Sequence, residues 1–444
     1  MRILRINSWD GPGTGGAEGY LRSVMDELES RGHPNLLVNL TDVRPPVPVP
    51  DERYLPMVPM TAAKARMRQD LGELPRVSAF LEETVRSFRP DLVQLHHFEA
   101  AFTTVGRFLR QLGVPLVVTA HDAWLVCPIG TLVRPGTVIC EGGIRWRCQF
   151  TGCAVGRGLP YSLWQKRLFD AWVAPKVRAY LCPSRSLMDY LDRHRYRPAV
   201  HLPSFAQIPL QVQQGSAPYP RGTAHIGWIG RLESYKGVED LLRAFVRVRS
   251  QYPDAILDIA GDGSARPALA SLSEQLGLGP AVKWLGRVRG PEKEAFFAGV
   301  KVLAVPSSQY ENFPLVALEA LARGRPVVGT AIGGIPEIVE DGRNGRIVPI
   351  QDPVALAEGL LDVLKDPARG ESWGATGRRK VLQEVTPERH VTRLLALYAA
   401  VLSGADLPSR LEAGALVPSG AVPSGPPGGD PEPFQTAPGK PKGT

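Results

Sequence analysis

The sequence predicts an α/β protein built from two Rossmann-like, doubly wound domains. Short apolar segments alternate with amphipathic helical segments, an order that is typical of parallel sheets with right-handed crossovers. The alternation stops at residues 202–222, which are rich in Pro, Gln, Gly and Ser, and then begins again. The 444 residues suffice for two units of roughly 200 residues each, so residues 202–222 are the expected linker.

The predicted strands are short runs of apolar residues. They are 3–6, 36–40, 92–95 and 116–119 in the first half, and 224–229, 256–260, 282–285, 302–305 and 326–329 in the second. Helices are predicted between them. The first, over 17–31, carries apolar residues at helical spacing and ends at Gly32.

The end of the chain contains one more helix and then a change of composition. Thr386 is a favourable N-cap and Pro387 a favourable first residue, which predicts a helix over 386–402 that packs back on the N-terminal domain. Residues 403–444 lose periodicity and become rich in Pro and Gly, so we expect a disordered tail. The two main domains are then predicted at 1–205 and 206–385.

Composition and charge narrow the class of protein. The chain is 43% hydrophobic and has no apolar run long enough to cross a membrane. Its first residues read as a strand rather than a signal peptide, so a cytoplasmic protein is expected. The net charge of +8 favours anionic partners. The basic residues are spread along the chain and no nucleic-acid-binding module is present, so nucleic acid is not an expected partner.

A glycine-rich segment follows the first predicted strand. Residues 11–16, Gly-Pro-Gly-Thr-Gly-Gly, formally match the G-x-G-x-x-G pattern of dinucleotide-binding folds. Pro12 stiffens the loop, however, and the loop begins unusually far from the strand. Three readings remain open: a dinucleotide site, a turn without a ligand, and a loop in which Gly15 and Gly16 let a ligand approach the backbone.

Charged residues follow two strands of the second half. Arg231 and Lys236 come after strand 224–229, at the carboxyl end where open parallel sheets bind ligands. A guanidinium fork and a compact ammonium together suit a pyrophosphate. Glu311 lies in the loop after strand 302–305, and Glu319 lies inside the helix expected to begin at Pro314. The free N–H groups of that helix would favour a phosphate, so this end of the sheet is a candidate seat for a nucleotide sugar.

Together, these segments resemble the retaining nucleotide-sugar glycosyltransferases of the GT-B fold, family four, over residues 1–402. The motifs that carry the resemblance are Gly15-Gly16, Thr119-Ala-His121-Asp122, Gly230-Arg231 with Lys236-Gly237, Gly261-Asp-Gly263, Glu311 with Glu319, and Gly333-Gly334. The resemblance implies that the two domains face each other across a cleft. The N-terminal domain would bind the acceptor and the C-terminal domain the nucleotide sugar.

The resemblance also implies roles for individual residues. Glu311, His121, Arg231 and Lys236 are the expected catalytic residues. Residues expected to bind the donor are Gly15, Gly16, Arg231, Lys236, Gly261, Asn312, Phe313, Leu315 and Glu319. Arg231 and Lys236 would bind the diphosphate, Glu319 the ribose hydroxyls, and Glu311 the sugar hydroxyls near the anomeric carbon. His121 would face the sugar from the other domain.

No catalytic cofactor is expected. The folded region contains no Asp-x-Asp pair that would hold Mg²⁺ or Mn²⁺. In the family, retention is usually explained by attack on the same face of the sugar, with the departing phosphate taking the acceptor proton. The chain departs from the family at Pro203-Ser204-Phe205, where an Asn-Gly turn usually follows the Pro, so a different hinge is expected.

Four of the five cysteines lie close together, at Cys127, Cys140, Cys148 and Cys153. Their spacings, with 12, 7 and 4 intervening residues, do not match a C-x₂-C zinc knuckle. The insert 127–153 is poor in core-forming residues, which favours stabilisation by a bound metal ion or a covalent cross-link. A structural zinc site, unrelated thiols and disulfides all stay open.

The acceptor side is less defined. Aromatic and basic residues alternate over 164–172, a pattern of either an interior helix or a peripheral contact with the inner face of a membrane. His96 and His97 end a strand and would line the cleft or serve the fold.

The predicted function is transfer of a sugar from a nucleoside diphosphate to a glycan, lipid-linked or small-molecule acceptor, as in polysaccharide biosynthesis. Two alternatives are an NAD-type oxidoreductase that uses residues 11–16 and a non-catalytic nucleotide-sugar binding protein.

Overall fold

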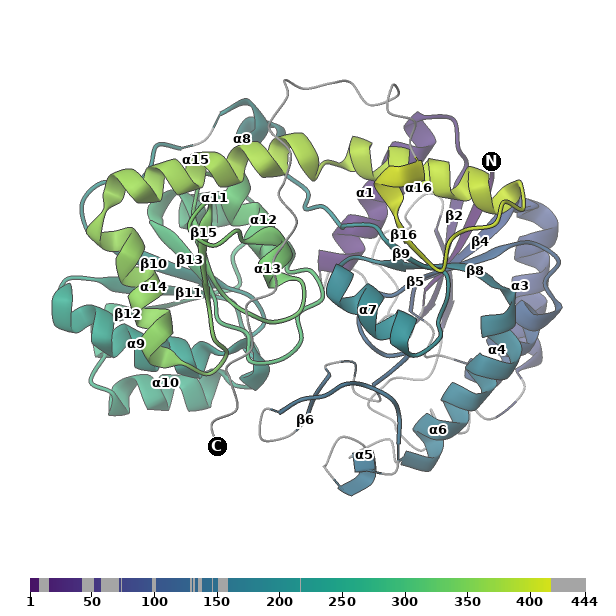
Figure 1. Ribbon diagram of the computed structural model, residues 1–444, viewed down its shortest axis with the longest axis horizontal. Coiled ribbons are helices and arrows are strands. Elements are labelled where there is room, and N and C mark those ends of the chain that lie inside the picture. Colours follow the sequence, from purple (N-terminus) through teal and green to yellow (C-terminus); the bar gives the residue numbers. More distant parts are fainter. Residues whose placement is uncertain are drawn as a thin grey trace, which may run out of the picture.

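The computed structural model describes residues 1–7, 16–41, 52–56, 72, 74–97, 101–127, 130, 132–134, 138–145, 147–150, 159–215 and 217–416. They form two parallel sheets, each covered by helices, which lie side by side (Figure 1). The predicted fold class is confirmed.

The first sheet has eight parallel strands in the order β16-β9-β8-β5-β4-β1-β2-β3. Their bounds are β1 Ile3–Asn7, β2 Asn35–Thr41, β3 Glu52–Pro56, β4 Leu92–Leu95, β5 Leu116–Thr119, β8 Val177–Cys182, β9 Ala199–His201 and β16 Arg410–Glu412. The helices of this half are α1 Gly16–Ser30, α3 Pro75–Phe88, α4 Phe102–Gln111, α6 Leu159–Leu168 and α7 Arg185–Arg193. A π-helical turn, η1 Phe169–Val173, and a 3₁₀ turn, η2 Ala174–Lys176, lead from α6 into β8.

The second sheet has six parallel strands in the order β12-β11-β10-β13-β14-β15. The bounds of its strands are β10 His225–Ile229, β11 Ile256–Ala260, β12 Val282–Gly286, β13 Val302–Val305, β14 Val327–Thr330 and β15 Gly345–Val348. Its helices are α9 Val238–Gln251, α10 Arg266–Gln275, α11 Gly290–Gly299, α12 Leu315–Ala322, α13 Ile335–Ile338, α14 Pro353–Lys365 and α15 Pro367–Glu384. Two 3₁₀ turns, η3 Ser234–Lys236 and η4 Gly279–Ala281, complete this half.

The central strands are apolar on both faces because helices cover both sides of each sheet. Every residue of β4, β5, β13 and β14 is buried. This burial explains why these strands are mostly apolar in the sequence, with Gln94, Thr119 and Thr330 as buried polar exceptions. The linker between the sheets contains a short helix, α8 Leu210–Gln214.

The last long helix returns to the first sheet. Figure 1 shows α15 running along the second lobe and α16, Pro387–Leu402, crossing to the first. Thr386 caps α16 by accepting a hydrogen bond from the Arg389 N–H. Val391, Leu394 and Tyr398 of α16 pack in one apolar cluster with residues of β1 and α1.

The structure corrects the predicted start of the tail. Residues 410–412 do not continue a disordered segment but form β16, which pairs in parallel with β9, and 3₁₀ turn η5, Ala413–Leu416, follows. Ala413 is buried against α16, which explains why these residues are ordered despite a polar, Pro-containing sequence. Residues 417–444 of the predicted tail lie outside the described residues.

The cysteine-containing insert holds little regular structure among its described residues. A two-stranded hairpin, β6 Val133–Arg134 and β7 Val138–Ile139, precedes a single helical turn, α5 Arg147–Phe150. Among the described helices, none combines the length and apolar character needed to cross a bilayer.

Candidate active site

The loops at the carboxyl ends of β10, β11 and β13 bring the predicted residues of the second sheet together. Arg231 and Lys236 follow β10, Gly261 follows β11, and Glu311 follows β13. Neighbouring parallel strands end at the same edge, so their loops meet there. At Gly261, a Cβ atom would stand 1.8 Å from the carbonyl oxygen of Gly230, so this glycine lets the loop after β11 pack directly on the loop after β10.

Glu311 is held by two donors at this edge. Lys236 forms an ion pair with its carboxylate, and the Ser307 hydroxyl donates a hydrogen bond of 2.9 Å to the same oxygen, Oε1. Both charged side chains are mostly buried. Arg231, in contrast, is exposed, and its guanidinium lies 3.4 Å from the Tyr235 hydroxyl. The pairing leaves Arg231 as the more accessible of the two predicted diphosphate ligands.

Glu319 has a separate partner. The Lys293 ammonium, on α11, lies 2.7 Å from Glu319 Oε1. The other carboxylate oxygen, Oε2, is buried and accepts no hydrogen bond from any described residue. Glu311 and Glu319 therefore each pair with a lysine of their own. Lys293 was not predicted, because nothing in the sequence of α11 distinguishes it from an ordinary surface lysine.

The N-terminal end of α12 lies between these two carboxylates. The N–H groups of Asn312, Phe313 and Leu315 donate to no acceptor in the described part of the chain. Pro314, which lacks an N–H, is the N-cap of α12 rather than its first residue. The helix therefore begins at Leu315, one residue later than the sequence predicted. These free donors, together with Arg231 and Lys236, make this end of the sheet electropositive and suited to an anion.

His121 reaches the same region from the first sheet, directly after β5. The Asn312 amide donates to the carbonyl oxygens of Ala120 (3.1 Å) and His121 (2.9 Å). Ser184, the N-cap of α7, donates a 2.8 Å hydrogen bond to the side-chain amide oxygen, Oδ1, of Asn312. Asn312 therefore bridges the two lobes beside Glu311. The sequence indicated its backbone N–H but not this side-chain bridge.

The His121 ring packs among other aromatic rings. It lies nearly parallel to the His96 and His97 rings, with ring centroids 5.1 and 5.2 Å away, and Tyr20 meets it edge-on. Burial, assisted by the nearby His97, lowers the pKa of His121 to about 3. The imidazole is therefore neutral at physiological pH, and both lobes contribute groups to one site.

The structure leaves the predicted roles of the glycine-rich loop and of the cysteine cluster untested. Gly15 lies outside the described residues, and Gly16 is the first residue of α1. Cys127 and Cys148 are buried and Cys140 is half-buried, but Cys153 also lies outside the described residues. Among the residues that are described, no three His, Cys, Asp or Glu side chains come together in a way that could hold a metal ion. The zinc site stays a prediction.

The aromatic residues predicted on the acceptor side contribute to the core. Trp164 and Trp172 pack against the main cluster of the first sheet. Lys166 binds Asp170 at 2.6 Å and the Tyr196 hydroxyl at 2.8 Å. This packing accounts for the mixed pattern over 164–172 without requiring a membrane.

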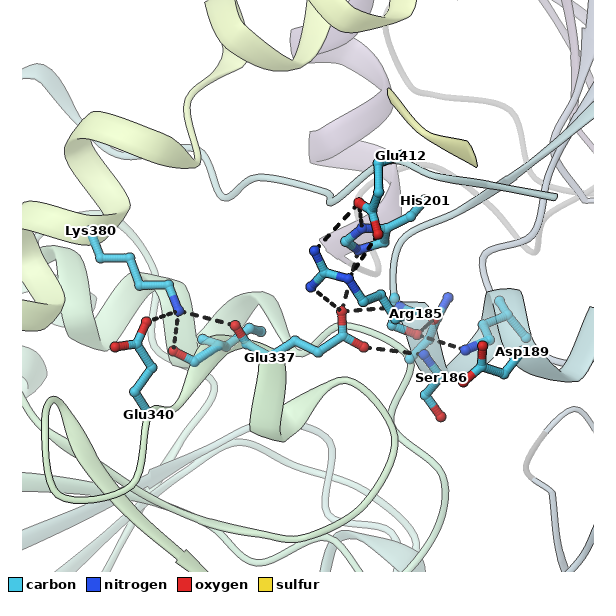
Figure 2. A network of polar contacts seen from close by, with 12 residues as sticks. Arg185, Ser186, Asp189, His201, Glu337, Glu340, Lys380 and Glu412 are labelled. Carbon is cyan, nitrogen blue, oxygen red and sulfur yellow. Dashed lines mark hydrogen bonds and ion pairs between the residues drawn. The ribbon is translucent and has the colours of Figure 1, made fainter. Parts of the chain in front are cut away.

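A second set of polar contacts joins the two lobes at α7 and α13 (Figure 2). Glu337, on α13, accepts hydrogen bonds from the backbone N–H groups of Arg185 (3.0 Å) and Ser186 (3.2 Å) at the N-terminus of α7. The His201 ring lies between two carboxylates, 3.3 Å from Glu337 and 2.7 Å from Glu412. Glu412, on β16, contacts His201 and Arg185 within the first lobe, and Glu337 makes the contacts that cross to the second.

This cluster predicts a pH dependence of stability. Burial alone would lower the pKa of His201, but Glu337 and Glu412 outweigh it and raise that pKa above 6.5. Burial opposes ionisation of Glu412, but His201 and Arg185 outweigh it and lower the pKa of Glu412 to about 2. His201 therefore stabilises the fold below about pH 6.5 and loses this effect as pH rises through its raised pKa. Glu412 stabilises above about pH 4.5 and loses its effect as pH falls toward 2.

Unfolding free energies of wild type, His201→Gln and Glu412→Gln across pH test this. The deficit of His201→Gln is expected to be largest near pH 5.5 and to shrink toward pH 9. The deficit of Glu412→Gln is expected to shrink between pH 5 and pH 3. Deficits that do not change with pH would contradict the assignment. Glu83→Gln, which removes an exposed carboxylate paired with Arg86 on α3, outside this cluster, is the control.

The chain matches two families of known sequence. Residues 14–202 match the model described as Glycosyltransferase Family 4, and residues 216–380 match Glycosyl transferases group 1. A glycogen synthase of Mycobacterium tuberculosis (strain CDC 1551 / Oshkosh) is 28% identical over 330 residues, covering 72% of this chain and 71% of the relative. A D-inositol 3-phosphate glycosyltransferase of Corynebacterium urealyticum is 40% identical over 155 residues, which cover 33% of this chain and 36% of the relative.

Solved structures share the fold. The sucrose-phosphate synthase of Thermosynechococcus elongatus superposes with a TM-score of 0.69 at 19% identity, covering 91% of this chain and all of that one. HepE of Anabaena, solved in complex with UDP, gives a TM-score of 0.65 at 17% identity over 90% of this chain and all of that one. With both halves matched by glycosyltransferase models and both lobes sharing this architecture, the chain belongs to the family-four glycosyltransferases of the GT-B fold.

Proposed function

We propose that this glycosyltransferase is a retaining enzyme that takes its sugar from a nucleoside diphosphate. The observation that carries the proposal is the arrangement around Glu311. Its carboxylate is held by Lys236 beside the free N–H groups of α12, and His121 stands across from it on the other lobe. This arrangement offers positive charge for a diphosphate and a carboxylate for sugar hydroxyls within one site.

The positive groups act on the leaving group. As the bond to the anomeric carbon breaks, negative charge builds on the diphosphate. Arg231, Lys236 and the N-terminal end of α12 stabilise that charge most strongly in the transition state because they are already oriented. The departing phosphate takes the proton of the attacking hydroxyl on the same face of the sugar. Glu311 positions the sugar and does not become its covalent partner.

Glu319 holds the other half of the donor. Its buried Oε2 atom has no hydrogen-bond partner among the described residues, and a buried carboxylate oxygen without a donor is unfavourable. A ribose hydroxyl would supply that donor. Lys293 orients the carboxylate through Oε1.

Catalysis is proposed to need no metal ion, since cationic side chains and backbone donors supply the positive charge. Transfer unchanged by excess EDTA supports this, whereas loss of transfer that Mg²⁺ or Mn²⁺ restores would refute it. The anomeric configuration of the product, read by proton NMR, tests retention: an inverted product would overturn the proposed course.

The acceptor is proposed to be a glycan, a lipid-linked acceptor or a small molecule that binds against the N-terminal lobe, in polysaccharide biosynthesis or a related pathway. The glycogen synthase and D-inositol 3-phosphate glycosyltransferase relatives are named for acceptors of the first and third kinds. Co-sedimentation with anionic vesicles, with and without a lipid-linked acceptor, tests the proposed peripheral membrane contact.

Nucleoside diphosphates are expected to stabilise the folded chain. A ligand at 100 times its Kd adds about 2.7 kcal/mol, which raises Tm by a few degrees. Thermal unfolding with UDP, GDP, ADP and NAD identifies the base and separates the main alternative. A shift with NAD alone would favour an oxidoreductase instead. A shift with a diphosphate but no turnover in a broad screen of donors and acceptors would favour a non-catalytic binding protein.

A further inference from the structure

A series of buried, hydrogen-bonded polar side chains runs through the first sheet toward His121. Arg5, on β1, is fully buried. Its guanidinium donates to the Gln94 side-chain oxygen and lies 3.3 Å from His96 Nε2. On the other side of the His96 ring, Nδ1 lies 2.8 Å from His121 Nε2. Arg5 in β1 and His96 after β4 thus link the core of the first sheet to His121, whose backbone carbonyl accepts from Asn312 of the other lobe.

Arg5 determines which ring nitrogen of His96, and then of His121, carries the proton. A guanidinium has only donors, so His96 Nε2, facing Arg5, must act as the acceptor. A neutral imidazole with an acceptor at Nε2 carries its proton on Nδ1, and this N–H then donates to His121 Nε2. His121 Nε2 is therefore also an acceptor, and the single proton of the neutral His121 ring resides on Nδ1.

The opposite tautomer of His96 would place one hydrogen-bond donor against another. With a proton on His96 Nε2, that N–H would point at the Arg5 guanidinium, in a place that water does not reach. Gln94 cannot relieve this, because its oxygen already accepts from Arg5 and from the Tyr398 hydroxyl, and its amide donates 2.6 Å to Thr119. Arg5 is held in place by the same contacts, so it cannot turn away from His96.

Both rings are neutral, as this argument requires. Burial, together with His121, Arg5 and His97, lowers the pKa of His96 well below its ordinary value. Burial and His97 do the same for His121. No described residue hydrogen-bonds to His121 Nδ1, so this N–H remains available to a ligand.

We propose that Arg5 and His96 are positioning residues that lock His121 in the Nδ1–H tautomer, so that His121 donates a hydrogen bond to a hydroxyl oxygen of the donor sugar. The role toward the sugar rests on the proposed function; the tautomer does not. With its proton fixed on Nδ1, His121 can donate to a sugar oxygen there. It cannot accept a hydrogen bond at Nδ1 from a group that has only donors. This tautomer also excludes His121 as a base, because Nδ1 already carries the proton and Nε2 accepts from His96.

The tautomer can be read without substrate. In the full chain labelled with ¹⁵N-histidine, long-range ¹H–¹⁵N spectra near pH 7 distinguish protonated from unprotonated ring nitrogens. The chain has eight histidines, and His96→Asn and His121→Asn spectra assign the two needed here. Both rings are expected to show Nδ1–H with an unprotonated Nε2. An Nε2–H form of His121 in the wild type would overturn the proposal.

Two pairs of variants test the cause. Arg5→Lys keeps a donor opposite His96 and is expected to keep the tautomer, whereas Arg5→Met is expected to mix the two forms of both rings. His96→Asn places an amide N–H near the former Nδ1, whereas His96→Leu removes the donor. If Arg5→Met does not fold, the His96 pair decides. An unchanged His121 tautomer in both Arg5→Met and His96→Leu would refute the proposal that Arg5 fixes this tautomer through His96.

Activity is measured separately. With a turned-over donor, kcat/KM is expected to fall about tenfold in Arg5→Met and His96→Leu, and much less in Arg5→Lys and His96→Asn, with nucleoside diphosphate binding unchanged in all four. Equal losses within each pair would mean that Arg5 and His96 serve only the fold. If no donor is turned over by any form, the proposed function fails while the spectra still decide the tautomer.

Discussion

Glu311→Gln is expected to lower kcat for sugar transfer by about 10²–10³-fold while leaving the affinity for nucleoside diphosphate within a few-fold of wild type. The substitution keeps the size of the side chain but removes the charge that pairs with Lys236 and accepts from Ser307. The sugar then loses its negatively charged neighbour near the anomeric carbon, where positive charge develops. Steady-state kinetics with the donor and calorimetric titration with the diphosphate separate the two effects.

Glu371→Gln is the matched control. Glu371 also pairs with a cation, Arg221 at 2.9 Å, but both side chains are about half exposed or more, and such surface pairs contribute little. It should leave kcat, KM and diphosphate affinity unchanged. If Glu311→Gln weakens diphosphate binding as much as it lowers kcat, Glu311 acts on the phosphates through Lys236 rather than on the sugar.

Gly333→Ala is expected to be strongly damaging to the Glu311 loop although it adds only one methyl group. Gly333 has φ of +59°, and a Cβ atom there would stand 1.9 Å from the carbonyl oxygen of Glu311. The same carbonyl accepts a 2.8 Å hydrogen bond from the Gly334 N–H, so the two loops are in direct backbone contact. Left-handed strain and overpacking together are expected to cost about 3 kcal/mol and to displace the Glu311 loop.

Gly342→Ala separates these two causes. Gly342 has a similar φ of +72°, but a Cβ atom there would meet nothing within 4 Å. It is expected to lose about 1 kcal/mol from left-handed strain alone and to keep full activity. Denaturant unfolding and transfer assays of both variants measure the difference. Equal effects of the two substitutions on activity would show that the contact between Gly333 and Glu311 does not shape the site.

The strand–loop order of the second half was predictable because it depends on local pattern. Parallel strands covered on both faces are mostly apolar, so β10, β11 and β13 are visible as short segments dominated by apolar residues, despite His225 and Asp258. Residues after such strands converge at one edge, which is why Lys236 and Glu311 could be expected together. Shorter or more polar strands, such as β9 and β16, lack this signal.

Contacts between distant segments were not predictable. Lys293 meets Glu319, and Asn312 meets the backbone after β5, without any local pattern that marks them. Glu337 caps the N-terminus of α7, 152 residues away in sequence for the Arg185 contact. A lysine or glutamate on a helix surface has the same local sequence whether it faces water or another lobe.

The sequence by itself determined the two doubly wound units, the carboxyl edge where the donor residues gather and the family to which they belong, since periodicity, glycine placement and charge after a strand are local properties. Only the tertiary structure decided which cation holds which carboxylate, how Asn312 and Glu337 join the lobes, and how Arg5 reaches His121 through His96. Those pairings depend on how the sheets and lobes pack, and burial gives them their strength because it removes the competing water.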